Sequence, residues 1–164
     1  MQSVYSDSTE SENGKALFKS LDQRTAAKLV QIGIEARFEP GETIFRPHDE
    51  SGQFYCLICG SIALEKPGAE RAIRIETLHG GDFVGWSALL GSGTRHFQAR
   101  ALTRAVVLTF DGALVRKACE ADPRFGYDLM KHLLFVATER LDATRIQLAE
   151  MQKGYVRDWG TAVA

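Results

Sequence analysis

The sequence predicts a mainly β fold flanked by helices: an antiparallel β-roll of the jelly-roll kind, also called a double-stranded β-helix. Three observations predict it. Short apolar runs separated by turns fill the middle of the chain, a helical pattern precedes them, and a longer helical pattern follows them. Strands of this length, at this turn spacing, are typical of antiparallel sandwiches and rolls. We therefore expect N-terminal helices, a β-roll with a short helix inserted between two strands, and a long C-terminal helix.

The bulk composition indicates a soluble globular protein of one domain. Of its 164 residues, 45% are hydrophobic and 25% are charged, and the formal net charge is −1. A chain so close to neutral gives no sign of a DNA partner or an acidic membrane surface, and no apolar run approaches the ~20 residues that span a bilayer. The polar, acidic stretch from Met1 to Asn13 lacks the apolar centre of a secretory signal. The three cysteines, an odd and low number, suit a reducing compartment, so we expect a cytoplasmic protein.

The N-terminal part is predicted to hold a disordered lead followed by helices. Residues 1–13 carry repeated pairs of serine and an acidic residue, a composition typical of disorder. Apolar residues then recur at helical spacing: they are Leu17, Phe18, Leu21, Ala26, Leu29, Val30 and Ile32. The pattern is interrupted near Ser20, where residues 20–23 offer a helix cap. We place the folded domain at residues 14–153 and a flexible tail at residues 154–164.

From Gly33 onward the pattern changes to short apolar runs that alternate with turns. The predicted strands are Ile34–Phe38, Glu42–Phe45, Phe54–Cys59, Ser61–Glu65, Arg71–Leu78, Phe97–Leu102 and Ala105–Phe110. Turn residues separate them at Glu39-Pro40-Gly41, residues 49–52, Gly60, Lys66-Pro67-Gly68 and Gly80-Gly81-Asp82. One insertion breaks this rhythm, because residues 85–90 are predicted to form a short helix between two strands.

Two helices are predicted after Asp111. The first covers Ala113–Glu120 and ends at Asp122-Pro123, and the second runs from about Arg124 to about Gln152. Apolar and small residues of the second helix alternate spacings of four and three, as in a heptad seam: Met130, Leu134, Ala137, Leu141, Thr144, Leu148 and Met151. We predict that this helix packs on the same helix of a second copy in a homodimer. The alternative is that the seam packs on the β-roll.

The segment 81–101 is the candidate binding site. It contains a strand end, Gly85, the short helix, a glycine-rich loop, Arg95 and a further strand. Because glycine allows close backbone approach at the helix start, we expect unpaired amide donors at the positive end of a helix dipole. The residues that supply them are Trp86, Ser87 and Ala88. Such an end binds phosphate and other anions, and the planar guanidinium of Arg95 suits a phosphate bidentately.

This layout resembles the cyclic-nucleotide-binding domain of the catabolite activator and Fnr-type regulators. The marks of the resemblance are Glu39-Pro-Gly-Glu42, Tyr55 to Gly60-Ser61, Gly81-Asp-Phe-Val-Gly85, and Thr94-Arg95 leading into Ala99-Arg100-Ala101. The similarity covers roughly Phe18 to Met151. Residues 85–87, 96–101 and 139–148 are similar to short stand-alone bacterial members, so we expect a member that lacks the helix-turn-helix domain. The resemblance implies that residues 85–90 form the phosphate-cassette helix.

The resemblance carries over to the site only in part. Arg95 falls where the family's arginine neutralises the cyclic phosphate, and Gly85 with the amides after it falls on the phosphate cassette. Trp86 stands where the family places a glutamate that accepts the ribose 2′-hydroxyl, and His96 stands where the catabolite activator has a serine that touches the phosphate. Two residues on the long helix fall at or beside the position that contacts the purine: they are Thr144 and Arg145.

The substitution at Trp86 bears on the ligand. A missing charge-assisted hydrogen bond costs ~1.5–3 kcal/mol, or about one to two decades of affinity, and the indole N–H donates rather than accepts. Cyclic AMP or cyclic GMP therefore remains a candidate, but a different phosphate- or carboxylate-bearing ligand with an aromatic or apolar part is favoured. The alternative is that Trp86 fills the former sugar site and no ligand binds.

Other reactive residues give weaker signals. Cys56 and Cys59 lie three apart on a predicted strand and so point to opposite faces, which rules out a shared metal or an easy disulfide. The four histidines stand in unlike contexts and predict no metal site, although His96 is expected to reach the ligand beside Arg95. No nucleophile–histidine–acid arrangement, phosphate-binding Walker loop or catalytic carboxylate pair is visible, so we expect no enzyme.

Three functions follow as hypotheses. The first is a homodimeric sensor in which an anionic ligand alters the long helix and the dimer passes the change to an unidentified partner protein. The second is a ligand-free module for dimerisation and protein interaction that keeps only the fold. A transcription factor is disfavoured because the residues after Met151 are too few for a helix-turn-helix domain, so DNA is not an expected partner.

Overall fold

The structure is a computed structural model that describes residues 21–50, 52–69, 71–91 and 94–161, with side chains described up to residue 152. It divides into two compact units, Met1–Asp128 and Leu129–Ala164, and each is described by itself. The predicted disordered lead at 1–13 and the helical residues Leu17 and Phe18 lie outside the described residues. The predicted domain boundaries stay predictions.

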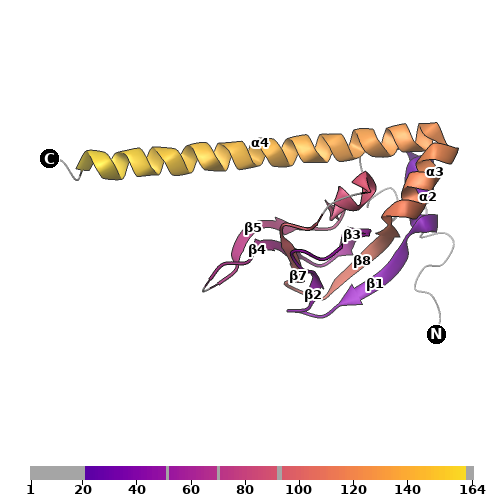
Figure 1. Ribbon diagram of the computed structural model, residues 1–164, viewed down its shortest axis with the longest axis horizontal. Coiled ribbons are helices and arrows are strands. Elements are labelled where there is room, and N and C mark those ends of the chain that lie inside the picture. Colours follow the sequence, from indigo (N-terminus) through magenta and orange to yellow (C-terminus); the bar gives the residue numbers. More distant parts are fainter. Residues whose placement is uncertain (1–20, 51, 70, 92–93, 162–164) are drawn as a thin grey trace. The chain divides into compact units, whose positions relative to one another are not determined.

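The first unit is a β-roll built from two antiparallel four-stranded sheets (Figure 1). One sheet has the order β1-β8-β3-β6 and the other has the order β2-β7-β4-β5. The strands are β1 (Ile34–Phe38), β2 (Thr43–Phe45), β3 (Gln53–Cys59), β4 (Ile62–Lys66), β5 (Ile73–Leu78), β6 (Phe83–Val84), β7 (Gln98–Ala101) and β8 (Ala105–Asp111). This arrangement confirms the predicted fold class.

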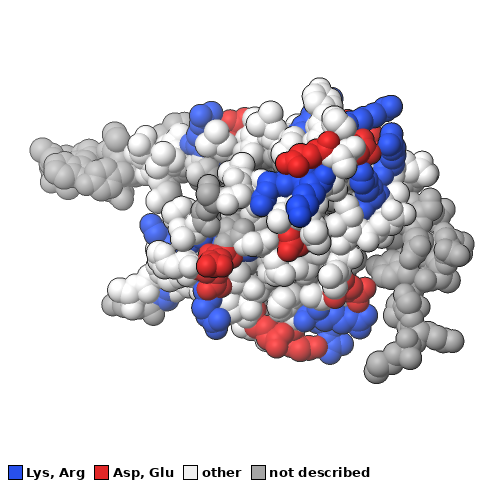
Figure 2. Space-filling model, turned by 45° about the vertical axis from the view of Figure 1, so that its right-hand side comes forward, with Lys and Arg blue, Asp and Glu red and all other residues white. Residues whose placement is uncertain are grey.

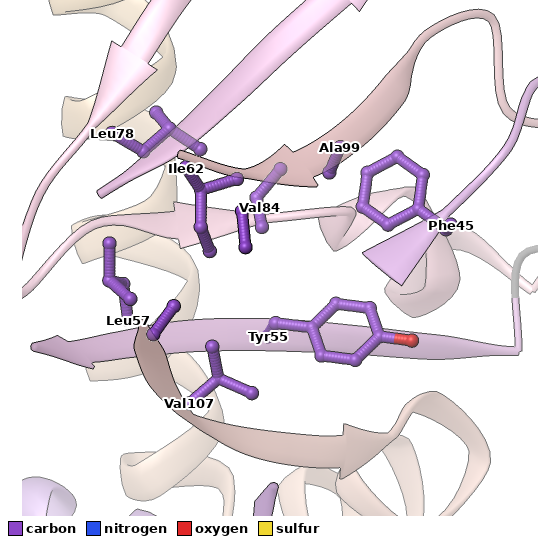
Figure 3. Close-up of a cluster of buried hydrophobic side chains, with 10 residues drawn as sticks. Phe45, Tyr55, Leu57, Ile62, Leu78, Val84, Ala99 and Val107 are labelled. Atoms are coloured by element: carbon purple, nitrogen blue, oxygen red, sulfur yellow. The ribbon is translucent and has the colours of Figure 1, made fainter. Parts of the chain in front are cut away.

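The core of the roll lies between the two sheets, because both contribute buried side chains to one cluster. Figure 3 shows Leu57 and Val107 on one side and Ile62 on the other, with Phe45 and Tyr55 at one end. Full burial of a Leu, Ile or Phe side chain stabilises a fold by about 1.5–3 kcal/mol. This cluster is therefore a main source of stability in the roll.

A second apolar group is aromatic and includes residues from three strands of one sheet. The rings of Phe54 and Phe110 stack with their centroids 4.8 Å apart, and Phe83 lies 6.3 Å from Phe54. The helices α2 (Gln23–Ile32) and α3 (Gly112–Ala121) each bury an apolar residue, Leu29 and Val115 respectively. The helices thus bury apolar surface that the sheets alone would leave in water.

Aspartates begin the helices, as their short side chains suit N-caps. Asp22 accepts a hydrogen bond from the Thr25 amide at 2.7 Å, within the predicted cap region. Asp111 accepts from the Leu114 amide at 2.9 Å at the start of α3. Asp122 accepts from the Phe125 amide at 3.2 Å, where α4 (Pro123–Thr161) begins. Proline fits the first turn of a helix because that amide needs no partner there.

The predicted end of the last helix was wrong. The sequence predicted an end near Gln152, whereas α4 continues to Thr161. The glycine at position 154 does not stop the helix, since a glycine inside a helix costs only about 1 kcal/mol relative to alanine.

One strand was not predicted: β6 was missed, because its two residues are too few to show an alternating pattern. The predicted short helix between two strands is confirmed, and it is a 3-10 helix, η1 (Trp86–Leu90). Cys56 and Cys59 point to opposite faces of β3 as predicted, since Cys56 is buried and Cys59 is exposed.

The second unit is described as part of a single helix, α4. Most residues of the predicted heptad seam are exposed on it: Met130, Leu134, Leu141, Thr144, Leu148 and Met151. Ala137 is half-buried. Within this unit the described residues offer no second element to cover the seam. Its packing on a second copy stays a prediction.

Candidate functional site

The candidate site begins where β6 turns into η1. Gly85 lies between them with a φ of 77°, in the left-handed region that favours glycine. At the other end of η1, Gly91 has a φ of 74°. These two glycines let the chain enter and leave a five-residue 3-10 turn abruptly, and the chain then reaches Arg95 just before β7.

Arg95 is the central residue of the site because it is a buried cation. Only 5% of its surface is exposed. Its Nη2 donates a hydrogen bond to the backbone oxygen of Gln53 on β3. Its guanidinium carbon lies 3.9 Å from the ring centroid of Phe45 and 5.8 Å from that of Tyr55.

Gly85 and Arg95 are in direct contact. A Cβ atom placed on Gly85 would clash with Nη1 of Arg95, at a separation far shorter than any real carbon–nitrogen contact. Position 85 therefore favours glycine for two reasons: the left-handed backbone and the closeness of the guanidinium, which a Cβ atom would displace. Gly85 and Arg95 of segment 81–101 therefore lie side by side, while their contacts with a ligand stay predictions.

The donors of Arg95 are incompletely used. Its Nε and Nη1 atoms are buried and have no hydrogen-bond partner among the described residues. Burial lowers the pKa of the guanidinium, although Tyr55 and Asp49 act in the opposite direction. A buried charge is costly unless an opposite charge or hydrogen bonds compensate it. The buried cation Arg95 therefore keeps two N–H donors that no described residue accepts.

The backbone around Arg95 is fixed by a second loop. The amide of His48 donates to the Arg95 oxygen at 2.8 Å, and the amide of Arg95 donates to the Asp49 oxygen at 3.5 Å. An isolated bridge joins Glu50 to Thr94. His48 has a φ of 68°, which L-residues other than glycine adopt at a cost. The structure thus holds a strained loop against the arginine.

The predicted donors at the start of η1 need correction. The amide of Ala88 is used, since it donates to the Gly85 oxygen at 3.2 Å within the 3-10 turn. The Ala88 oxygen also accepts a hydrogen bond from Nη1 of Arg116 on α3 at 2.6 Å. A single short turn has too few aligned peptides to form an anion-binding helix terminus. Trp86 and Ser87 are half-buried there, and their ligand contacts stay predictions.

The other predicted ligand residues lie in different surroundings. His96 follows Arg95 and is exposed. Thr144 and Arg145 lie on α4 in the second unit, where the Thr144 hydroxyl donates to the Arg140 oxygen at 2.8 Å and Arg145 pairs with Asp142 at 3.5 Å. Contacts of all three with a ligand stay predictions.

Sequence reasoning missed the aromatic surroundings of Arg95. Phe45 and Tyr55 are buried core residues on β2 and β3, and their rings stack with centroids 6.0 Å apart. The alternation of apolar residues placed both in predicted strands, but it could not show that they face the same arginine. The Gln53 oxygen was missed too, because a backbone acceptor leaves no mark in a sequence.

Other kinds of site find no support in the described part of the chain. Its His, Cys, Asp and Glu residues include no group of three placed to hold a metal ion. None of its helices is both long and apolar enough to cross a membrane. On the face shown in Figure 2, basic and acidic side chains lie beside one another instead of forming a patch of one sign.

Solved structures share this fold. The N-terminal domain of a transcriptional regulator from Streptomyces coelicolor A3(2) is 21% identical, with a TM-score of 0.64 over 77% of this chain and 91% of that one. The c-di-GMP-responsive global regulator CLP from Xanthomonas campestris is 21% identical, with a TM-score of 0.69 over 76% and 62% of the two chains. The catabolite activator protein of Thermus thermophilus is 18% identical, with a TM-score of 0.67 over 83% and 62%.

Sequence comparison gives one curated relative and one family. A candidate potassium channel protein from Rhodopseudomonas palustris is 28% identical over 107 residues, and the match covers 65% of this chain but only 26% of that protein. The model of the cyclic nucleotide-binding domain matches residues 35–122, which is more than half of the chain and includes Gly85 and Arg95. The chain therefore belongs to the cyclic nucleotide-binding domain family.

Proposed function

We propose that this chain is a small-molecule-sensing regulatory domain that binds an oxyanion, carried by a larger ligand, at Arg95. The single observation that carries the proposal is the buried guanidinium with two donors that no described residue accepts. A phosphate or carboxylate supplies both the negative charge and the acceptor atoms that Arg95 lacks.

The chemistry of Trp86 bears on which ligand this is. An indole stands where the family has a ribose-binding glutamate, so the ribose 2′-hydroxyl would lose its acceptor. The loss is worth about one to two decades in affinity. A ligand with a phosphate or carboxylate and an aromatic or apolar part therefore suits the site better than cyclic AMP or cyclic GMP.

Signalling is proposed to pass through a homodimer. The heptad seam of α4 carries several exposed apolar residues, among them Leu134, Leu141 and Leu148. A helix with such a seam buries it against a copy of itself in a coiled coil. Ligand binding would change the pairing of the two helices, and a partner protein would detect that change. No enzymatic step and no DNA contact form part of this proposal.

A ligand-free interaction module is the second candidate, and one observation favours it. The Nε and Nη1 atoms of Arg95 are covered as well as unpartnered among the described residues, and the ring of Phe45 already attracts the cation. In this case the whole domain serves only to dimerise and to dock on a partner protein.

Thermal melting against a panel of ligands separates the two. The panel holds cyclic AMP, cyclic GMP, other nucleotides, inorganic phosphate and simple carboxylates. A ligand present at 100 times its dissociation constant stabilises the folded state by ~2.7 kcal/mol. We expect at least one such shift in the wild type and none in Arg95→Ala.

The matched control is Arg104→Ala, which removes an exposed arginine paired with Glu39 and should keep the full shift. If no ligand shifts the wild type, the sensor is wrong and the interaction module stands. If Arg95→Ala shifts as much as the wild type, the ligand binds elsewhere. Retardation of DNA in a gel at physiological salt would contradict the absence of a DNA partner.

A further inference from the structure

We propose that Phe45 and Tyr55 form an aromatic seat that positions Arg95 for its anion without neutralising it. The inference rests on the proposed function and names the residues that make Arg95 competent. The aromatic seat is defined by these two rings, and both are positioning residues rather than ligand contacts.

The seat joins the two sheets at one end of the core. Phe45 lies on β2 in one sheet and Tyr55 on β3 in the other. Their rings are inclined by 20° to each other, with centroids 6.0 Å apart. Figure 3 shows the pair at the end of the buried cluster, with the Tyr55 hydroxyl pointing away from it. That hydroxyl donates to Oε1 of Gln53 at 3.3 Å, so the tyrosine is anchored beside the residue whose oxygen accepts from Arg95.

The seat holds the guanidinium but leaves donors unused. A cation over an aromatic ring is attracted by the negative face of the ring, and this attraction uses no N–H donor. With the guanidinium carbon 3.9 Å from the Phe45 centroid and Nη2 bonded to Gln53, the position of the group is fixed at two points. Nε and Nη1 then keep their hydrogens for an external acceptor.

The absence of net charge in the seat is the decisive property. An aspartate or glutamate in place of Phe45 would hold Arg95 as firmly, but it would cancel the charge and compete with an anion for the same donors. A neutral ring attracts the cation and leaves the positive charge in place. A buried arginine held by aromatic rings and one backbone oxygen is therefore ready for an anion.

The test removes the Phe45 ring and follows both Arg95 and the binding of anions. In Phe45→Leu we expect about a tenfold weaker response to inorganic phosphate and cyclic AMP in melting titrations, as expected when a desolvated cation–π contact is lost. Phe45→Tyr keeps a ring and should stay within about twofold of the wild type. Phe38→Leu is the matched control, since Phe38 packs on the same cluster and should leave the response unchanged.

A spectroscopic readout separates positioning from stability. The side-chain Nε–H resonance of Arg95, assigned with Arg95→Lys, should carry a ring-current shift in the wild type and in Phe45→Tyr, and should lose it in Phe45→Leu. If phosphate or cyclic AMP raises the melting temperature of Phe45→Leu as much as that of the wild type, the proposed role of the aromatic seat is wrong while the proposed function stands. If neither phosphate, cyclic AMP nor any other ligand of the panel shifts the melting of the wild type, the aromatic seat and the proposed function are both wrong. If Phe45→Leu fails to fold, the unshifted resonance of Arg95 in Phe45→Tyr would overturn the seat.

Discussion

Arg95 and Arg100 lie five residues apart in the sequence, but their guanidinium groups have opposite kinds of surroundings. Arg100 on β7 donates from Nε to Oε2 of Glu65 at 3.1 Å and from Nη2 to Oε1 at 2.5 Å. Gln98 adds a third bond to that carboxylate at 2.9 Å. Arg95 has no such partner among the described residues and lies against aromatic rings and one backbone oxygen.

The difference distinguishes a cation paired with a carboxylate from a cation with no carboxylate partner among the described residues. The hydrogen bond to Glu65 raises the pKa of Arg100, and the same bond is the main reason that the pKa of Glu65 is lowered. The pKa of Arg95 is instead lowered, chiefly by burial. The charge of Arg100 is paired within the fold, whereas in the proposed function the charge of Arg95 serves to bind an anion.

The largest expected effect compares the two arginines directly. Arg100→Met leaves the Glu65 carboxylate, which is only 3% exposed, with Gln98 alone, and should lower the free energy of unfolding by about 3 kcal/mol. Arg95→Met removes a charge that has no carboxylate partner among the described residues and should change the free energy by less than about 1 kcal/mol. Urea denaturation of both variants measures the contrast. Equal losses would show that Arg95 is as structural as Arg100.

Next in size is the contact between Gly85 and Arg95. Gly85→Ala should cost about 2–3 kcal/mol, because a left-handed alanine is strained and its Cβ displaces the guanidinium. Gly41 has a φ of 90°, and a Cβ atom added there would meet nothing within 4 Å, so Gly41→Ala should cost only the strain of about 1 kcal/mol. Denaturation gives both values, and only Gly85→Ala should also lose the response to anions. Equal costs would mean that Arg95 moves aside freely.

The pH dependence of stability tests the pair of Arg100 and Glu65. Because its pKa in the folded state lies below the ordinary 4.5, its contribution is complete above pH 4.5 and is lost as the pH falls through the lowered value. The difference in unfolding free energy between wild type and Glu65→Gln should be constant from about pH 7 to 5 and shrink as the pH falls towards 3. A difference that is independent of pH would show that the Glu65 carboxylate does not need its charge.

The smallest effect concerns the loop that holds the Arg95 backbone. His48→Gly removes about 1–2 kcal/mol of strain from the left-handed position, but it also adds chain entropy to the unfolded state. We therefore expect the free energy of unfolding to rise by about 0.5 kcal/mol. His96→Gly is the control, since His96 has no such φ and should lose about 0.5 kcal/mol. If the free energy of unfolding falls in both variants, His48 is not strained.

The sequence was sufficient to predict the structural features that depend on residues close together in the chain. Apolar alternation and turns predicted β1 to the residue, and the aspartate cap of α2 followed from residue type. The family resemblance selected Gly85 and Arg95 as site residues one by one, but it did not predict that the two lie against each other. Each of these signals lies within a short stretch of chain.

Features that depend on distant residues escaped prediction. Glu65 and Arg100 are 35 positions apart, and Arg95 and Gln53 are 42 apart. Strand pairing decides which of these side chains meet, and one sequence does not reveal the register. The short helix η1 was predicted, but its 3-10 type was not, because a helical pattern does not distinguish one hydrogen-bond spacing from another.

The two cysteines of β3 give the strand beside Arg95 a chemical reporter of its own. Cys56 is buried, and burial raises the pKa of its thiol, whereas Cys59 is exposed. A thiol reagent should therefore modify Cys59 in the native protein and reach Cys56 only when the roll opens. The ratio of the Cys56 rate to the Cys59 rate measures how often strand β3 is released from the sheet. A ligand that acts through Arg95 and stabilises the roll would lower that ratio, by more when its concentration exceeds its dissociation constant by more.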